Sequence, residues 1–191
     1  PPLTSITGLP TPAGDPWISA EFKGKEYAVD VDGAKQILTD AKYTGEGDKL
    51  VDPDGEAVTF TLSVPQGWSD YVTGISLIQQ SVKALGIDAK TDTPDADSWW
   101  AAKSTGDFDA ILPWTDTGLT PYDLYANMMS GEFFKPIGED ANYNFGRFQD
   151  PAVDAALKEF TTAADDAARL AALEVIQAAF VDTVPTMPVG T

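Results

Sequence analysis

The sequence contains no histidine and no cysteine. Without these residues the chain cannot build a thiol nucleophile, a Ser-His triad or a typical zinc site. It also lacks any apolar run close to the ~20 residues that a bilayer-spanning helix requires. We therefore expect no catalytic residue, no metal and no cofactor.

Basic residues are scarce as well. Twelve lysines and arginines stand against thirty acidic residues, which gives a net charge of -18. Such a surface repels the phosphate backbone of nucleic acids and also anionic membranes. Hydrophobic residues make up 43% of the 191 positions, so a packed core with a well-solvated surface is predicted.

Composition divides the chain near residue 30. Residues 1–29 are rich in Pro, Gly, Thr and Ser and lack periodicity, which predicts an extended connector on the surface. Trp17 and Phe22 are expected to hold it down. Residues 30–191 are expected to form one α/β ligand-binding lobe.

Hydrophobic periodicity predicts the elements of that lobe. A helix begun by Asp32 is expected over residues 32–43, followed by a polar loop over 46–56. Three short strands then alternate with two helices, a pattern typical of a mostly parallel sheet flanked by helices. The strands are expected at residues 58–64, 87–91 and 108–112, and the helices at 69–85 and 97–106. Further helices are expected at 120–130, from 150 and from 165, with an irregular loop at 131–149 and a strand or extended return segment at 184–189.

The loops that follow the first and third strands are the expected ligand loops, because open α/β sheets bind ligands at the carboxyl ends of their strands. These loops carry large aromatic rings beside amide, hydroxyl and carboxylate groups, a chemistry suited to a sugar. A residue of the 131–149 loop, Asn144, is added to the candidates. The candidate ligand-binding residues are Gln66, Trp68, Trp114, Asp116, Tyr122 and Asn144.

Several of these residues have a structural alternative. Trp68 and Trp114 are either stacking platforms or aromatic residues packed beneath a helix. Trp99 and Trp100 are adjacent on a helix and cannot face the same way, so we expect one in the core and the other at a rim. Arg147 is expected to pair with a nearby carboxylate.

The acidic residues allow two further hypotheses. Those between Asp48 and Glu56 suggest a calcium loop, but neither register places Gly and Glu where an EF-hand needs them, so a polar turn is preferred. Carboxylate pairs, Asp107 with Asp109 or Asp95 with Asp97, could serve a carbohydrate-active hydrolase. Pairs of this kind arise easily among thirty acids.

Four blocks of sequence resemble the second lobe of the extracellular solute-binding proteins that serve ABC importers for dipeptides, oligopeptides, nickel and oligosaccharides. The blocks are Ser-Val-Pro-Gln-Gly-Trp-Ser-Asp-Tyr at 63–71, Gly-Asp-Phe-Asp-Ala at 106–110, Thr-Pro-Tyr-Asp at 120–123 and Asn-Phe-Gly-Arg-Phe-Gln-Asp-Pro-Ala-Val-Asp at 144–154. The segment from Phe180 to Pro188 resembles that family's return to its first lobe. The Pro-Gln-Gly-Trp-Ser-Asp block is similar to the cellobiose and oligosaccharide branch.

The resemblance implies a type II periplasmic-binding-protein-like lobe that closes on a ligand together with a first lobe absent from this chain. It implies an ABC transporter permease as partner and an extracytoplasmic location, in the periplasm or as a cell-surface lipoprotein. Peptide binders of the family usually carry an acid before the Pro of the 120–123 block, whereas this chain has Thr120. An oligosaccharide is therefore favoured over a peptide, and both over a hydrolase activity.

Overall fold

The protein, described by a computed structural model over residues 4–46, 48–115 and 118–189, divides into two compact units. The sheet unit comprises Ala28–Lys103 and Asp107–Pro113. The helical unit comprises the residues up to Tyr27, Ser104–Gly106 and the residues from Trp114 onward. Residues 30–191, which the sequence assigns to one lobe, are thus shared between the two units.

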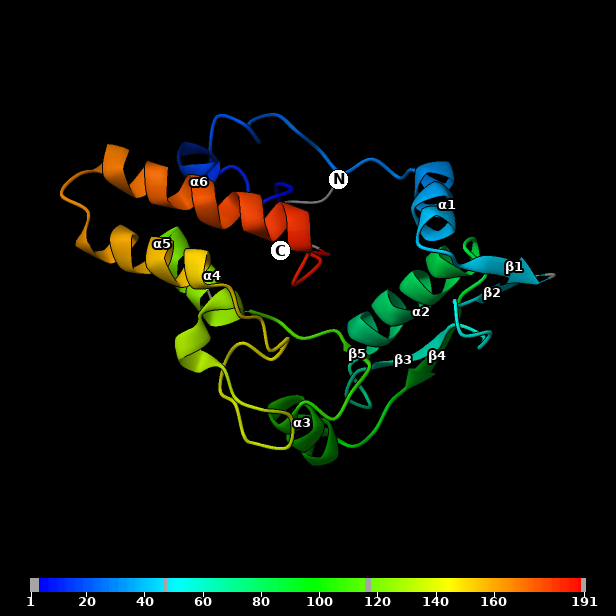
Figure 1. The fold of residues 1–191 in the computed structure, drawn as a ribbon. Helices are drawn as coiled ribbons and strands as arrows, with labels where there is room; N and C mark the ends of the chain where they lie inside the picture. The colour runs from blue at the N-terminus through cyan, green and yellow to red at the C-terminus, as the bar shows by residue number, and fades with distance from the viewer. Residues whose placement is uncertain (1–3, 47, 116–117, 190–191) are drawn as a thin grey trace. The chain divides into compact units, whose positions relative to one another are not determined.

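The sheet unit is built around a small parallel sheet. Its strand order is β4-β3-β5, and both neighbouring pairs are parallel, with Leu62 opposite Thr91 on one side and Ala110 on the other. The strands are β3 (Thr59–Ser63), β4 (Asp88–Asp92) and β5 (Ala110–Ile111), and the intervening helices are α2 (Ser69–Lys83) and α3 (Ala96–Thr105) (Figure 1). The predicted alternation of strands and helices is confirmed, with β5 shorter than expected.

The core of the sheet unit is small and aliphatic. Leu62 and Val64, two residues apart, point to the same side of the sheet and are buried with Ile75 of α2 and Ala89 of β4. Leu62 and Val64 belong to the apolar positions whose alternation with polar residues predicted β3. Successive side chains of a strand point to opposite faces, so these apolar residues share the buried face.

The first part of the sheet unit differs from the prediction. Helix α1 (Val31–Asp40) is capped by Asp30, whose Oδ1 accepts from the Gly33 N–H at 2.8 Å, and not by Asp32. An antiparallel hairpin of β1 (Thr44–Glu46) and β2 (Lys49–Val51) extends into the predicted polar loop. Three-residue strands are too short to show an alternating pattern, so the sequence gives no signal for them.

In its described residues the helical unit contains three main helices and two short 3-10 turns. Helices α5 and α6 pack against each other, and α4 packs against α5 (Figure 1). The elements are η1 (Asp15–Trp17), α4 (Pro121–Met129), η2 (Gly131–Phe133), α5 (Pro151–Thr162) and α6 (Asp166–Thr183). None of the helices in the described residues has the length and apolar character needed to cross a bilayer.

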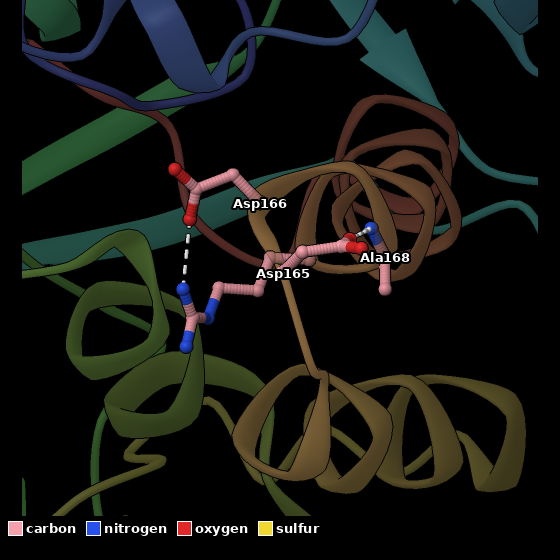
Figure 2. A network of polar contacts seen from close by, with 4 residues as sticks. Asp165, Asp166 and Ala168 are labelled. Carbon is pink, nitrogen blue, oxygen red and sulfur yellow. Dashed lines mark hydrogen bonds and ion pairs between the residues drawn. The ribbon is translucent and has the colours of Figure 1, made fainter.

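Aspartate caps begin α5 and α6, as the sequence predicts. The Asp150 side chain accepts from the Ala152 N–H at 2.8 Å, and the Asp165 side chain accepts from the Ala168 N–H at 2.9 Å (Figure 2). A carboxylate at this position satisfies an otherwise unpaired helix donor and complements the helix dipole.

The N-terminal segment belongs to the core of the helical unit and is not a surface connector. Leu9, Ile18 and Phe22 are buried against the helices. Gln177 of α6, which is fully buried, accepts from the Ser19 N–H and donates to the Trp17 carbonyl oxygen, both at 2.8 Å. The backbone of the N-terminal segment is therefore hydrogen-bonded to α6, as expected for a part of the core.

The C-terminal segment contains no strand within the described residues 184–189. Helix α6 ends at Val184, which adopts a left-handed conformation (φ 46°) and donates to the Phe180 carbonyl oxygen at 3.0 Å. Of the two predicted alternatives, a strand or an extended return segment, the strand is wrong; the segment continues as bends and irregular chain.

Candidate functional site

The loop after β3 carries two of the predicted ligand residues in the sheet unit. The N–H of Val64 donates to the Asp92 carbonyl oxygen (3.1 Å), and that of Gln66 to the Pro94 carbonyl oxygen (2.8 Å), so the chains leaving β3 and β4 are joined. Gly67 then turns with φ 85°, a conformation that side chains disfavour. The result is an exposed Gln66 and a half-buried Trp68 at the carboxyl end of the sheet.

Trp68 lies in a cluster of aromatic rings within the sheet unit. Its ring centroid is 5.2 Å from that of Tyr71 in an edge-on arrangement and 6.0 Å from that of Trp99. Trp99 is fully buried, and its Nε1–H donates to the Ser63 carbonyl oxygen at 3.2 Å. The ring behind Trp68 is therefore fixed to the end of β3, which holds Trp68 in place before a ligand arrives.

Trp100 and Lys103 complete the cluster. Trp100 is 39% exposed, which confirms that one of the two adjacent tryptophans is in the core and the other at a rim. The Lys103 Nζ lies 3.9 Å from the Trp100 ring centroid and 5.4 Å from that of Trp99, and the lysine is buried. An ammonium over indole faces is stabilised by a cation–π interaction.

The sequence analysis missed Tyr71 and Lys103. Their signal was present, because Tyr71 follows Trp68 by three residues and Lys103 follows Trp99 by four. On a helix such spacings place side chains on one face.

The other predicted residues belong to the helical unit. Trp114 is 43% exposed, and Tyr122 is half-buried with its ring stacked on Phe160 at 6.1 Å. Asp116 lies outside the described residues. Each unit thus carries its own part of the predicted set: Gln66 and Trp68 in one, Trp114 and Tyr122 in the other.

Asn144 has a structural position that argues against ligand contact. The side chain is 1% exposed, and its Nδ2 donates to the carbonyl oxygens of Ser130 (3.0 Å) and Phe148 (2.8 Å). Its Oδ1 accepts from the Phe148 N–H at 2.8 Å. A buried amide with these bonds holds the loop together, and a ligand could reach it only by breaking them.

Among the residues that the structure describes, Arg147 has no carboxylate partner, contrary to the prediction. Its guanidinium donates to main-chain carbonyl oxygens: Nη2 to Ser104 at 2.7 Å and to Glu139 at 3.3 Å, and Nη1 to Asn144 at 3.5 Å. A planar group with five N–H donors suits several carbonyls at once. Arg147 therefore fixes the irregular loop to the 104–106 segment.

The acidic residues considered for catalysis or calcium have local structural partners. Asp109 accepts from the Thr61 N–H (2.9 Å) at the sheet, and Asp52 accepts from the N–H groups of Asp54 and Glu56 (both 2.9 Å) in a polar turn. The hydroxyl and N–H of Ser98 donate to Asp95, which lowers the pKa of its carboxyl. A glycosidase acid needs a raised pKa, so Asp95 is unsuited to that role.

No group of three potential metal ligands gathers among the described residues. Asp48, Asp54 and Glu56 are exposed, so water competes for their carboxylates.

Comparison with known proteins gives a family match over most of the chain. The model of bacterial extracellular solute-binding proteins, family 5 middle, matches residues 3–135. Protein XP55 of Streptomyces lividans is 27% identical over 173 residues, which make up 90% of this chain and 30% of that protein.

Solved structures share the fold. An oligopeptide ABC transporter periplasmic oligopeptide-binding protein from Thermotoga maritima, crystallised with mannohexaose, superposes with a TM-score of 0.86 at 23% identity, over 97% of this chain and 35% of that one. The periplasmic binding protein DppA from Helicobacter pylori, in complex with peptide STSA, gives 0.73 at 18% identity, over 98% and 32%. The predicted fold of a periplasmic-binding-protein lobe is confirmed, and the chain spans about a third of the length of these proteins.

Proposed function

Because the chain belongs to family 5 of the bacterial extracellular solute-binding proteins, we propose that it captures an oligosaccharide for an ABC importer. In this proposal it forms one lobe of a two-lobed protein, located in the periplasm or on the cell surface as a lipoprotein. The ligand stabilises the closed state by touching both lobes, and the closed protein delivers it to the transporter permease. No covalent chemistry takes part.

The observation that carries the proposal is the supported indole of Trp68. A pyranose presents a flat face of C–H groups that stacks on an indole ring, and such stacking is most favourable when the ring is ordered beforehand. Trp68 meets this condition, because Tyr71 and the buried Trp99 contact it while part of its surface remains exposed.

Polar partners for sugar hydroxyls complete the proposed site. Gln66 is exposed beside Trp68 and offers an amide that both donates and accepts. As separate proposed contacts on the helical unit, Trp114 offers an exposed ring, and Asp116 and Tyr122 are the residues with oxygen atoms for a sugar. Asn144 is left out of this set because its amide is buried and already bonded.

A peptide is the second candidate ligand. The Helicobacter relative was solved with a peptide, while the Thermotoga relative was solved with mannohexaose. The peptide alternative needs an acid for the terminal ammonium, and Thr120 cannot provide one at the position where peptide binders of the family usually do. We therefore place the oligosaccharide first.

The test uses the intact two-lobed protein with cellotetraose and with short peptides, followed by tryptophan fluorescence and thermal shift. We expect a response to the sugar alone, and we expect Trp68→Ala to weaken binding at least tenfold, about 1.4 kcal/mol. Trp100→Ala is the matched control, because that ring is also partly exposed and packs on Trp99 and the Lys103 ammonium.

A response to peptides alone would sink the oligosaccharide proposal. Unchanged sugar affinity in a folded Trp68→Ala protein, checked by circular dichroism, would show that the indole is structural. Trp68→Phe separates the two roles further, because it keeps a stacking ring of smaller area.

A further inference from the structure

A pocket of about 440 Å³ lies within the helical unit, between η1, the start of α4, the end of α5 and the start of α6. This volume is in the range of small-molecule sites. Its walls combine three aromatic rings with hydroxyl, carboxylate and guanidinium groups. The residues used below are Trp17, Thr120, Tyr122, Phe160, Asp166 and Arg169.

The aromatic wall is held in place from behind. Phe160 is buried in the core, with its ring centroid 6.1 Å from those of both Trp17 and Tyr122. The Trp17 main chain is fixed in turn by the bond from Gln177. Trp17 and Tyr122 are only half-buried, so ordered ring surface remains open to the pocket.

The polar side of the pocket places a donor beside an acceptor. Arg169 Nη1 and Asp166 Oδ1 form an ion pair of 2.7 Å in the first turn of α6, which Asp165 caps through the Ala168 N–H (Figure 2). This contact uses one nitrogen of a group with five N–H donors and one of two carboxylate oxygens. Each hydroxyl of a sugar ring both donates and accepts hydrogen bonds, so two neighbouring hydroxyls can bind a donor and an acceptor that lie side by side.

Thr120 adds a hydroxyl at the entrance to α4. It occupies the N-cap position, yet its side chain makes no capping hydrogen bond, unlike the aspartates that begin α5 and α6. The residue is half-buried at the pocket wall, and its hydroxyl can donate or accept a hydrogen bond.

We propose that this pocket binds one pyranose ring, as a sugar subsite of the helical unit. The proposal rests on the proposed function in taking the ligand to be a sugar. A purely apolar ligand would bury Asp166 and Arg169 without new partners, at a cost. An anion would meet the carboxylates of Asp123 and Asp166 against the single guanidinium of Arg169 in the lining.

The test labels the intact protein with 5-fluorotryptophan and follows the five tryptophans of this chain by fluorine NMR. Trp17 reports on the pocket, and Trp68 and Trp114 report on the platform residues; single Trp→Phe variants assign the signals. The probes are methyl β-glucopyranoside, as a single ring, and cellotetraose. We expect the Trp17 signal to shift saturably with the single-ring probe.

Variants then connect that shift to the pocket. Arg169→Gln and Asp166→Asn should each weaken the Trp17 titration at least tenfold and leave the Trp68 titration unchanged. Lys135→Gln is the control, since it removes an exposed positive charge of the helical unit that does not line the pocket.

The outcomes separate this proposal from the proposed function. A Trp17 signal that does not move with either sugar, or moves equally in both pocket variants and the control, overturns the pocket subsite even if Trp68 responds. A Trp17 shift without any response at Trp68 or Trp114 supports the pocket and contradicts the platform.

Discussion

The two units use their aromatic residues differently. In the helical unit Tyr125, Phe160 and Phe180 are buried and fill the space between the N-terminal segment and the helices. In the sheet unit the buried cluster of β3, α2 and β4 is aliphatic, and the buried ring of Trp99 lies against the half-buried Trp68. Trp68 therefore keeps exposed ring surface that is available for a ligand.

The difference follows from the geometry of the elements. Alternating side chains of a short parallel sheet pack closely on one helix, and residues such as Leu62, Val64 and Ile75 fill that layer. Helices joined to an irregular segment leave wider and less regular gaps. Large rings fill such gaps, as where Tyr125 meets Phe180 at 5.9 Å.

Phe180→Ala should have the largest effect on stability. The ring is 1% exposed, so its removal should cost about 3–5 kcal/mol of unfolding free energy through lost burial and a cavity. Trp68→Ala, at a half-buried position, should cost clearly less. Urea denaturation of both variants measures the contrast, and equal losses would show that Trp68 is a core residue like Phe180.

Gln177→Leu should rank second. It removes both bonds that hold the N-terminal segment, leaving the Ser19 N–H and the Trp17 carbonyl without a side-chain partner, and should cost about 2–4 kcal/mol. The counterpart in the sheet unit is Gln79→Leu, which removes a single half-buried bond to the Ala89 carbonyl oxygen and should cost about 1 kcal/mol. A larger loss for Gln79→Leu in the same denaturation series would contradict the view that the N-terminal segment is core.

Gln177 also explains why the prediction of a surface connector over residues 1–29 is wrong. The composition of residues 1–29 is typical of a connector, and nothing local indicates that a residue 160 positions away bonds to Trp17. Buried long-range polar contacts have no periodicity. By contrast, the β3 alternation and the Asp150 and Asp165 caps are local signals, and the structure confirms them.

The candidate site was predictable to the same extent. The rule that ligands bind at strand ends identified the loops of Trp68 and Trp114, because it needs only the order of elements. It could not tell that Asn144 is buried while other candidate residues are exposed. An asparagine side chain suits both a ligand contact and a hydrogen bond within a loop. The rule also could not find the pocket around Arg169, which is formed by elements that are distant in sequence.

Alkaline pH should weaken the helical unit through Tyr125. Burial raises the pKa of this phenol above its usual value of 10.0, and its hydroxyl donates to the Thr7 carbonyl oxygen at 2.8 Å. The unfolded chain therefore releases this proton first, so stability is intact below pH 10 and falls as pH rises above it, by up to about 1.4 kcal/mol per pH unit.

Between pH 8 and 11, the unfolding free energy should fall less steeply with pH in Tyr125→Phe than in the unmodified protein. Tyr27→Phe is the comparison: burial raises the pKa of that phenol as well, but it is 52% exposed, so its removal should flatten the slope less. Equal slopes in Tyr125→Phe and the unmodified protein would mean that Tyr125 becomes accessible to solvent before global unfolding.

The smallest contrast lies between two helix starts of the helical unit. Asp150→Ala removes a cap that accepts a hydrogen bond, and it should cost about 1 kcal/mol. Thr120→Ala removes an N-cap side chain that makes no such bond, so it should change stability by a few tenths of a kcal/mol at most. If Thr120→Ala proved as costly in urea denaturation as Asp150→Ala, the Thr120 hydroxyl would be a structural cap in solution and unavailable to a sugar. A small loss combined with a weaker Trp17 titration would instead assign that hydroxyl to the pocket.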